Sequence, residues 1–339
     1  MSDDAFSHFL TRIEGGDSLA REEAAQVFGM IMDGDVRDPQ IAAFLTALAR
    51  RRPSVEEVVG AAEAMRTRMI PVDGVEGAID LCGTGGDALN TLNISTACAF
   101  VVAGAGVPVA KHGNRSMSSK SGAADVIEAL GAKIDLGSAE AAKCLRSTGV
   151  CFLFAQAYHP AMKHAGPVRR ALGFRTIFNL LGPLANPAKV KRQLVGVYDE
   201  DAIDTIAQAL RRLGTQVAWV VHGEDGLDEF SIGGATKVAM LDNGKVIRKR
   251  IVPEDAGLAR TKLEAIRGGT PKENARALEK LLEGERGAYR DVVLLNAGAA
   301  LCVAGKAPSL EEGVVVAATS IDTGRALGTL HAFVRQTQS

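Results

Sequence analysis

Residues 79–110 read IDLCGTGGDALNTLNISTACAFVVAGAGVPVA, and this stretch indicates the fold class. A short apolar run at Ile79–Cys82 predicts a strand, and the glycine-rich segment after it predicts a tight loop. Asn93–Thr96 then opens a helix, and the apolar run Ala97–Ala110 predicts that this helix is buried and leads into a second strand. A strand, a helix and another strand in this order are typical of parallel strands joined by a helical crossover.

Apolar runs of strand length recur along the rest of the chain, and each predicts a further strand. With the first run, they lie at Ile79–Cys82, Val107–Ala110, Val150–Phe154, Leu194–Val197, Val217–Val221 and Val292–Leu295. Helical patterns separate several of these runs. The polar stretch between Val238–Leu241 and Ile251–Val252 contains Asn243-Gly244, which predicts a hairpin turn.

The first seventy residues show helical patterns only. Asp38-Pro39 predicts the cap and first turn of a helix whose apolar residues recur at one-face spacing over 41–48. Ser54 and Glu57 have the spacing of a capping box, and Ser18 predicts the cap of an earlier helix. The pattern changes near Pro71.

These patterns together predict an α/β protein in two parts. A small all-helical domain covers residues 1–72, and a larger α/β domain covers residues 73–339. The larger domain has a mostly parallel central sheet covered by helices, because its strands alternate with helices along the chain.

The composition excludes several classes of protein. The 339 residues include 39 basic and 40 acidic side chains, so the net charge of −1 argues against a protein that coats nucleic acid. Aromatic residues make up only 4%, which disfavours stacking platforms for single strands. The N-terminus carries Asp3 and Asp4 and no long apolar segment, so we expect no secretory signal. Ala97–Ala110 is too short to span a bilayer, and we expect no membrane partner.

Cysteine usage predicts a cytoplasmic location. The five cysteines are scattered, mostly inside apolar runs, and none forms a CxxC pair; they are Cys82, Cys98, Cys144, Cys151 and Cys302. Such a set is typical of reduced core thiols rather than of a zinc or redox site.

The glycine-rich loop 83–87 is the first segment that points to chemistry. Glycines let backbone N–H groups approach an anion, and the start of a helix at 93–96 adds further donors and a favourable dipole. A dinucleotide site would need an acidic residue about twenty residues later, but residues 103–115 contain none. A purely structural turn would leave Asp87, Ser95 and Thr96 unexplained. We therefore expect an anion site here.

A second loop, KHGNRSMSSK at residues 111–120, carries three cationic side chains, three serines and no acid. Placed after a strand at the carboxyl edge of a parallel sheet, it suits a phosphate-rich ligand. A solvated charged loop is the alternative, but such a loop normally mixes charges of both signs. His112 alone is weak evidence for a catalytic base.

Two further blocks complete the candidate site. Asp228 and Glu229 follow a predicted strand, and adjacent carboxylates there can hold Mg²⁺ together with substrate phosphates. This pair would be inconclusive without the two anion loops. The block 159–187 contains an arginine pair, Arg169-Arg170, that could bind a carboxylate, whereas we expect Met162 and Phe178 to belong to the core.

Taken in order, GTGGD (83–87), NIST (93–96), KHGNR (111–115), HPAMKH (159–164), RTIFNLLGPL (175–184) and DEF (228–230) closely resemble the anthranilate phosphoribosyltransferase family. The resemblance covers essentially the whole chain. It implies a helical domain, joined by residues from about 160 to 185, and an active site in the cleft beside the α/β domain. It also implies a homodimer formed through the helical domain.

The resemblance implies a reaction and a set of site residues. The reaction is Mg²⁺-dependent transfer of the phosphoribosyl group of phosphoribosyl pyrophosphate to anthranilate, with one or two Mg²⁺ ions and no assigned general base. Gly83, Asn114 and Arg169 match anthranilate contacts, and Ser95, Asp228 and Glu229 match metal ligands. The matches to the phosphoribosyl pyrophosphate site are Gly83, Gly86, Asp87, Thr91, Asn93, Ile94, Ser95, Thr96, Lys111, His112, Gly113, Asn114, Arg115, Ser116, Met117, Ser118, Ser119 and Ala123.

Two positions depart from the family pattern. Ala88 and Ala123 stand where the family often has Gly and Ser, and the missing hydroxyl at Ala123 removes one expected phosphate contact. A pyrimidine nucleoside phosphorylase is the nearest alternative enzyme, but it should not need the acidic pair. A catalytically silent homologue that binds nucleic acid would need neither the metal acids nor the phosphate loops.

Overall fold

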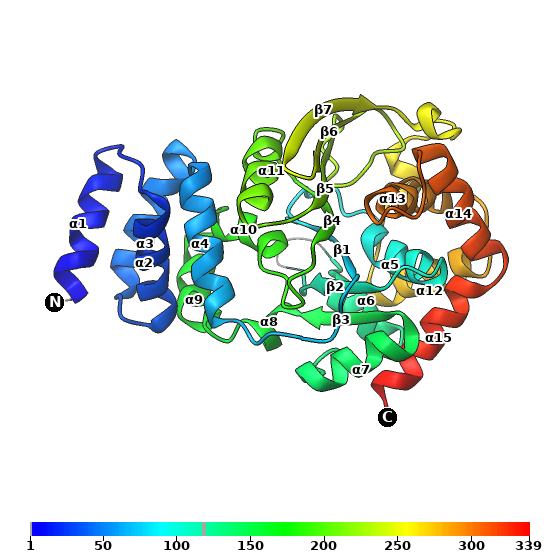
Figure 1. Cartoon of the computed structure of the whole chain (residues 1–339), viewed down its shortest axis with the longest axis horizontal. Helices are drawn as coiled ribbons and strands as arrows, with labels where there is room; N and C mark the ends of the chain where they lie inside the picture. The colour runs from blue at the N-terminus through cyan, green and yellow to red at the C-terminus, as the bar shows by residue number, and fades with distance from the viewer. Residues whose placement is uncertain (1, 117–119) are drawn as a thin grey trace.

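The computed structural model of the chain describes residues 2–116 and 120–339. It is elongated, with a helical end that holds the N-terminus and a larger end built around a sheet (Figure 1). Four helices in succession form most of the helical end, which confirms the predicted helical start of the chain. They are α1 (Ser2–Glu14), α2 (Arg21–Asp33), α3 (Asp38–Arg51) and α4 (Val55–Arg68).

One sheet of seven strands forms the centre of the larger end. The strand order is β3-β2-β1-β4-β5-β6-β7, and the first five strands run parallel. The bounds are β1 Ile79–Gly83, β2 Val109–Gly113, β3 Val150–Phe154, β4 Arg192–Gly196, β5 Val217–Gly223, β6 Thr236–Asp242 and β7 Lys245–Ile251. The predicted mostly parallel sheet is therefore confirmed. Because the chain leaves β1 toward β2 on one side and returns to β4 on the other, the sheet has a switch point between β1 and β4.

Strands β6 and β7 form the predicted hairpin and pair antiparallel with each other and with β5. Asn243 and Gly244 make its two-residue turn, and both have positive φ values, 43° and 85°. This backbone geometry is the one that the Asn-Gly pair favours in a tight hairpin.

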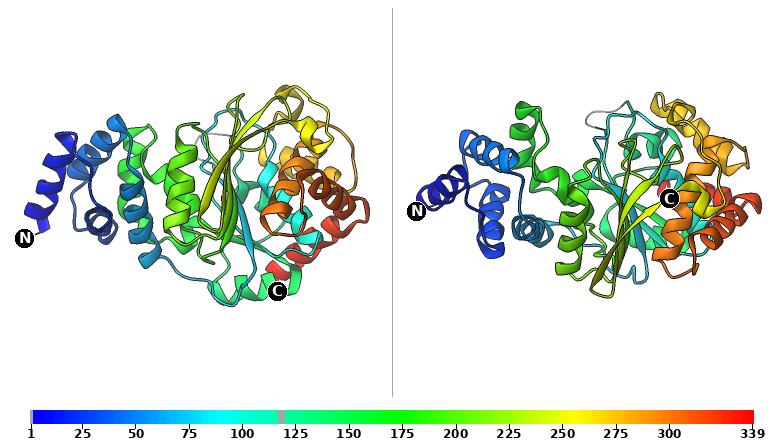
Figure 2. Two further views of the ribbon diagram at one scale, coloured as in Figure 1. Left: turned by 45° about the horizontal axis from the view of Figure 1, so that its top comes forward. Right: turned by 90° about the horizontal axis from the view of Figure 1, so that it is seen from above.

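Helices cover both faces of the sheet. Figure 2 shows the C-terminal helices packed on the side of the sheet away from the helical end. The helices of the larger end are α5 (Ile94–Gly104), α6 (Ala123–Ala129), α7 (Ser138–Thr148), α11 (Ala202–Arg212), α12 (Pro271–Leu282), α13 (Ala288–Val303), α14 (Leu310–Asp322) and α15 (Arg325–Thr337). Within the described ranges, no helix combines the length and the apolar character needed to cross a membrane.

The core consists of two apolar clusters on opposite faces of the sheet. Along β4 the side chains alternate, since Leu194 joins the cluster under α5 and α13 while Val195 joins the other one. That second cluster continues without a break into the helical end, where it includes Phe28 and Phe44. The helical end and the larger end are therefore joined by an apolar cluster to which both contribute.

Residues 155–184 run from the end of β3 to the helical end. They form α8 (Ala155–Tyr158), α9 (Met162–Leu172), α10 (Phe178–Leu181) and a 3₁₀ turn at Gly182–Leu184. Helix α9 packs against α2 and α3, and the Phe178 ring lies edge-on to Phe28 with ring centroids 5.6 Å apart. This segment brings Arg169 to the rim of the cleft.

Three sequence-based predictions about secondary structure were wrong. Val292–Leu295 lies inside α13 and is not a strand, because a helix that is buried on nearly every side shows no periodicity over four residues. Ser18 does not cap α2: the cap position is Ala20, whose N–H donates to the Glu23 carboxylate at 2.8 Å. Asp38 is likewise the first residue of α3 and not its cap, which is Arg37.

The capping box at Ser54 and Glu57 is confirmed. Glu57 N–H donates to the Ser54 hydroxyl at 3.3 Å, and Ser54 N–H donates to the Glu57 carboxylate at 2.8 Å. The same buried carboxylate also accepts from Leu19 N–H at 2.9 Å and pairs with Arg51. One side chain therefore ties α3, α4 and the start of α2 together.

Candidate active site

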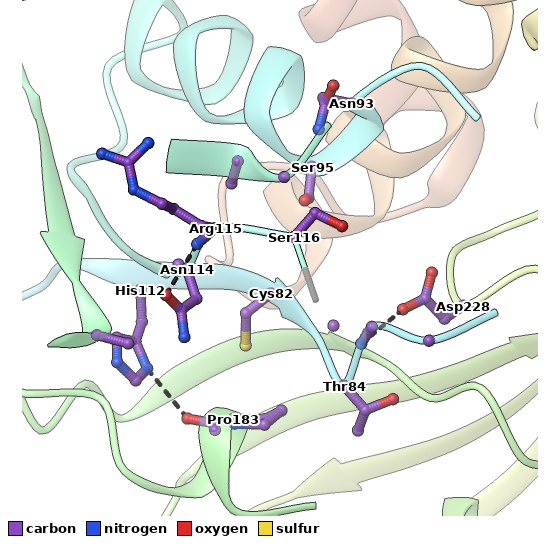
Figure 3. Close-up of a pocket in the computed structure, with 18 of the residues that line it drawn as sticks. Cys82, Thr84, Asn93, Ser95, His112, Asn114, Arg115, Ser116, Pro183 and Asp228 are labelled. Carbon is purple, nitrogen blue, oxygen red and sulfur yellow. Dashed lines mark hydrogen bonds between the residues drawn. The ribbon is translucent and has the colours of Figure 1, made fainter. Parts of the chain in front are cut away.

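A cavity of about 400 Å³ lies where the carboxyl ends of β1 and β2 face the helical end. It is at the switch point between β1 and β4, which is the usual ligand site of an open parallel sheet. Figure 3 shows Ser95, Asn114 and Asp228 on three sides of this space. The helical end contributes Met65 from α4 and Arg169 from α9.

The cavity brings together the predicted site residues that the structure describes. They are Gly83, Gly86, Asp87, Thr91, Asn93, Ile94, Ser95, Thr96, Lys111, His112, Gly113, Asn114, Arg115, Ser116, Ala123, Arg169, Asp228 and Glu229. The predicted residues Met117, Ser118 and Ser119 lie outside the described residues.

The glycine-rich loop begins where β1 ends. Thr84 N–H donates to the carbonyl of Gly196 at 2.9 Å, and Gly85 N–H donates to the Asp228 carboxylate at 3.0 Å (Figure 3). Position 196 must be a glycine, because a Cβ there would stand 1.5 Å from the carbonyl oxygen of Asp228. The ends of β1 and β4 therefore hold the acidic loop close against the glycine loop.

Lys111 brings a positive charge to the buried end of the cavity. Its side chain is 3% exposed, and its ammonium donates to the carbonyl of Leu81 at 2.7 Å and to the Ser95 hydroxyl at 3.1 Å. Lys111 lies in β2, and Ser95 lies in the first turn of α5. A cation, a hydroxyl and a helix N-terminus thus converge, which is an arrangement that favours an anion.

Arg115 is held by its own segment, although it lines the cavity. Its guanidinium pairs with Asp125 at 2.9 Å and with Glu128, both on α6. Asp125 also accepts from Gly122 N–H at 2.8 Å and from Ser116 N–H at 3.2 Å. The carboxylates that pair with Arg115 lie on α6, after the basic stretch 111–120. That stretch itself contains no acid, so its sequence did not predict this pairing.

Glu229 is buried and Asp228 is half-buried, and the pair lies in an unfavourable electrostatic environment. Burial and the neighbouring charge of Asp87 raise the pKa of Asp228 to about 7, and burial and the charge of Asp228 raise the pKa of Glu229 to about 8. Lys111 and a hydrogen bond from Ser95 oppose the rise at Glu229. Bringing a divalent cation to this cluster of carboxylate and hydroxyl oxygens would offset the repulsion, so the residues fit Mg²⁺. Among the described residues, no group of three or more His, Cys, Asp or Glu side chains forms a complete metal cage. Substrate phosphates and water would have to supply the remaining ligands.

The opposite end of the cavity, toward α9, is aromatic and cationic. The Arg169 guanidinium lies 5.2 Å from the centre of the Phe178 ring, and burial lowers its pKa. Both Phe178 and Met162 line the cavity, so the expectation that they serve only the core was incomplete. A partly buried guanidinium beside an aromatic ring suits a planar carboxylate ligand.

Two histidines on the cavity wall contact each other. Nε2 of His112 lies 3.3 Å from Nε2 of His159, and Nδ1 of His112 lies 3.1 Å from the carbonyl oxygen of Gly182. Burial lowers the pKa of His112 to about 3 and that of His159 to about 4, so both rings are neutral near pH 7. Because the Nδ1–H of the neutral His112 ring donates to the carbonyl of Gly182, its Nε2 carries no proton and can only accept. The Nε2–H of His159 is therefore the donor between the two rings.

Sequence reasoning did not assign several residues of this wall. Gln156, His159, Asn179, Gly182 and Pro183 line the cavity together with the predicted residues. Four of them lie in the motifs HPAMKH and RTIFNLLGPL, but no role was predicted for them there. Their shared position depends on the path of residues 155–184, which no local pattern shows.

The comparisons with known proteins cover almost the whole chain. Residues 75–327 match the glycosyl transferase family α/β domain, and residues 7–69 match the helical bundle domain of that family. The chain is similar to an anthranilate phosphoribosyltransferase of Azorhizobium caulinodans, with 52% identity over 98% of this chain and 97% of that protein. It shares 52% identity with the corresponding protein of a Chelativorans strain, over 96% of each chain.

Solved structures give the same result. The anthranilate phosphoribosyltransferase of Thermus thermophilus superposes with a TM-score of 0.91 at 41% identity, covering 97% of this chain and 99% of that one. The Saccharomyces cerevisiae enzyme in complex with phosphoribosyl pyrophosphate and Mg superposes with a TM-score of 0.90 at 29% identity, covering 98% of each chain.

The raised pKa values of the acidic pair predict an unusual dependence of stability on pH. Because both folded pKa values exceed the ordinary 3.8 and 4.5, the metal-free folded protein binds more protons than the unfolded chain between about pH 4 and pH 8, and its stability falls as pH rises there. Asp228→Asn with Glu229→Gln removes this cost. With a chelator present, we expect the double variant to exceed the wild type in free energy of unfolding by several kcal/mol at about pH 8.

Urea denaturation of both proteins at several pH values measures this difference. It should shrink toward zero near pH 4.5, where the carboxyls of the wild type are protonated as well. A difference that stays constant across the range would contradict the buried, raised-pKa description of the pair.

Proposed function

The chain belongs to the anthranilate phosphoribosyltransferase family, and from this membership we propose that it transfers the 5-phosphoribosyl group of phosphoribosyl pyrophosphate to the amine of anthranilate. Pyrophosphate is released, and the product belongs to the second step of tryptophan biosynthesis from chorismate. The observation that carries the proposal is the cavity lined by two anion loops, an acidic pair and Arg169.

We propose that phosphoribosyl pyrophosphate occupies the end of the cavity near the sheet. The backbone of the glycine loop, the first turn of α5 and the Lys111 ammonium offer donors to its phosphate groups there. The donors are fixed by the strand ends and by the helix, so they need no reorganisation as negative charge develops on the leaving pyrophosphate.

Ser95, Asp228 and Glu229 are the residues that would hold Mg²⁺, as one ion or two. When bound, Mg²⁺ neutralises charge on the pyrophosphate leaving group. Asp228 accepts a hydrogen bond from Gly85 N–H in the glycine loop, and Ser95 in the first turn of α5 helps to lower the pKa of Glu229, so the elements that approach the phosphates also act on both carboxylates.

Anthranilate would occupy the end of the cavity near α9. The Arg169 guanidinium would bind its carboxylate, while Asn114 and the backbone at Gly83 would contact the ring and amine. The Asn114 amide is oriented, since its oxygen accepts from Arg115 N–H at 2.8 Å. The neutral His112 and His159 add no charge to this end, so Arg169 is the cation that faces the carboxylate.

The reaction needs positioning more than proton transfer. An aromatic amine is a weak nucleophile, and its proton becomes acidic only as the new bond to the ribose C1 forms. We assign no general base for this reason. Holding amine and C1 in one closed cavity supplies the orientation that an encounter in solution lacks.

We further propose that the chain acts in the cytoplasm as a homodimer assembled through the helical domain, residues 1–72 together with about 160–185. Helix α1 and helix α3 support this arrangement, because they lie in the helical end away from the sheet (Figure 1) and contribute no described residue to the lining of the cavity. Nucleic acid and membranes are not among the partners that we propose.

Loss of anthranilate fluorescence after addition of phosphoribosyl pyrophosphate tests the activity directly. We expect a loss that requires Mg²⁺ in the wild type. Asp228→Asn with Glu229→Gln should lower turnover by at least about a hundredfold, because the leaving group loses its charge stabilisation. Soluble, folded wild-type protein without any Mg²⁺-dependent loss would refute the proposed activity. Nucleosides with free phosphate would be the next substrates to test.

Arg169 and its neighbour Arg170 form a matched pair for testing the anthranilate end. Arg169 lines the cavity, whereas Arg170 is exposed on the same helix. We expect Arg169→Gln to raise KM for anthranilate at least about tenfold, since a hydrogen bond to a charged group contributes about 1.5–3 kcal/mol. KM for phosphoribosyl pyrophosphate should stay nearly constant, and Arg170→Gln should change neither value. Equal effects of the two substitutions would argue against a carboxylate site at Arg169.

The proposed homodimer predicts a particle of twice the chain mass. Multi-angle light scattering of the full chain measures this mass without reference to activity. A single-chain mass at micromolar protein concentration would contradict the dimer and would leave the proposed reaction untouched.

A further inference from the structure

Asn93 occupies the cap position of α5, but its side chain does not cap the helix. Asparagine is among the preferred capping residues, because its side-chain oxygen normally accepts from a backbone N–H in the first turn. At Asn93 that oxygen accepts from another side chain instead. The exception lies at the helix end that faces the candidate phosphate site.

Asn274 is the residue that draws the Asn93 amide away. Nδ2 of Asn274 donates to Oδ1 of Asn93 at 2.8 Å, and Nδ2 of Asn93 donates to the carbonyl of Ser121 at 3.3 Å. Asn274 is 2% exposed, and its own oxygen accepts from Gly269 N–H at 2.7 Å. Because the Asn274 oxygen is engaged in this way, its NH₂ group must face Asn93, and the direction of the whole chain of bonds is determined.

The backbone of Asn93 is held from the same side. The Tyr289 hydroxyl donates to the Asn93 carbonyl at 3.1 Å, and burial raises the pKa of Tyr289 well above its ordinary value, so the hydroxyl keeps its proton. Leu92 N–H donates to the carbonyl of Ile266 at 2.9 Å, just before α12. The segment before α5 therefore rests on the segment from Ile266 to Asn274.

Drawing the amide away leaves donors available at the start of α5. Among the described residues, the backbone N–H groups of Ile94, Ser95 and Thr96 have no acceptor, whereas Ala97 N–H already donates to the Asn93 carbonyl at 3.2 Å. All three residues with available donors line the cavity. A capping amide at this position would compete with a phosphate for the same donors.

We propose that Asn274 is a positioning residue for phosphate binding, which holds the Asn93 amide away from α5 and so keeps the first-turn N–H groups free for a phosphate of phosphoribosyl pyrophosphate. The inference rests on the proposed function, because it takes that compound as the ligand. Asn274 does not line the cavity. It acts through Asn93, which lies 181 residues earlier in the chain.

The alternative is that Asn274 only stabilises the start of α12. Glu273 offers a matched control, since its carboxylate accepts from Thr270 N–H at 2.7 Å and caps the same helix without contacting Asn93. If stability of α12 were the whole role of Asn274, Glu273→Ala would weaken phosphate binding in the same way.

Calorimetric titration with phosphoribosyl pyrophosphate and Mg²⁺, without anthranilate, measures the effect apart from turnover. We expect Asn274→Leu, which is neutral and of similar size, to raise Kd about tenfold, because Asn93 then becomes free to cap α5. Tyr289→Phe keeps the ring and removes one support of Asn93, so it should raise Kd about threefold. Glu273→Ala should stay within about twofold of the wild type.

The Asn93→Ala background separates positioning from general destabilisation. Without the Asn93 side chain no competing cap can form, so adding Asn274→Leu should change Kd by less than about twofold. A tenfold further loss in this background would overturn the inference, as would wild-type affinity in Asn274→Leu. If Asn274→Leu does not fold, Tyr289→Phe with wild-type affinity would overturn it as well. Wild-type protein that binds no phosphoribosyl pyrophosphate would refute the proposed function itself, and the inference with it.

Discussion

The close approach of the loop carrying Asp228 to the ends of β1 and β4 is the constraint on which the site depends. A side chain at Gly196 would collide with the Asp228 backbone, and one at Gly83 would meet its carboxylate at 2.7 Å. Glycine at both strand ends lets the acidic loop lie directly over the switch point of the sheet. The Asp228 carboxylate then orders the glycine loop through Gly85 N–H, so one contact shapes the acidic and the anion-binding sides of the cavity together.

This arrangement is unfavourable for the empty protein and favourable for a ligand. Two adjacent carboxylates, one buried and one half-buried, lie beside a third, and Lys111 faces Glu229 from β2 with a positive charge. Carboxylates that are removed from water without enough positive charge nearby destabilise the folded protein. Binding sites commonly carry this cost, and the rest of the fold must offset it. Here the offset comes from the two apolar clusters, one of which extends from the sheet into the helical end. The packing that stabilises the chain also brings Arg169 opposite the acids.

Individual elements show where sequence patterns suffice and where they fail. The hairpin at Asn243-Gly244 and the capping box at Ser54 were predictable, because short-range backbone geometry determines both. The helix at Val292–Leu295 was mistaken for a strand, because burial on all sides removes the periodicity that distinguishes the two. In the site, the loop residues were predictable from their chemistry. His159 and Gln156 were not predictable, since a polar residue after a strand can face solvent, cap a helix or line a site, and its residue type does not distinguish these roles.

The sequence by itself determined the α/β class, the helical start of the chain, the two anion loops and the acidic pair. Each depends on residues close together in the chain, whose spacing and chemistry can be read directly. Only the tertiary structure decided how residues 155–184 carry Arg169 to the cavity, that Arg115 is engaged by α6, and that Asn274 holds Asn93. These contacts join segments with no shared local pattern. They exist because the parallel sheet brings distant strand ends to one edge and the apolar clusters hold the helices around it.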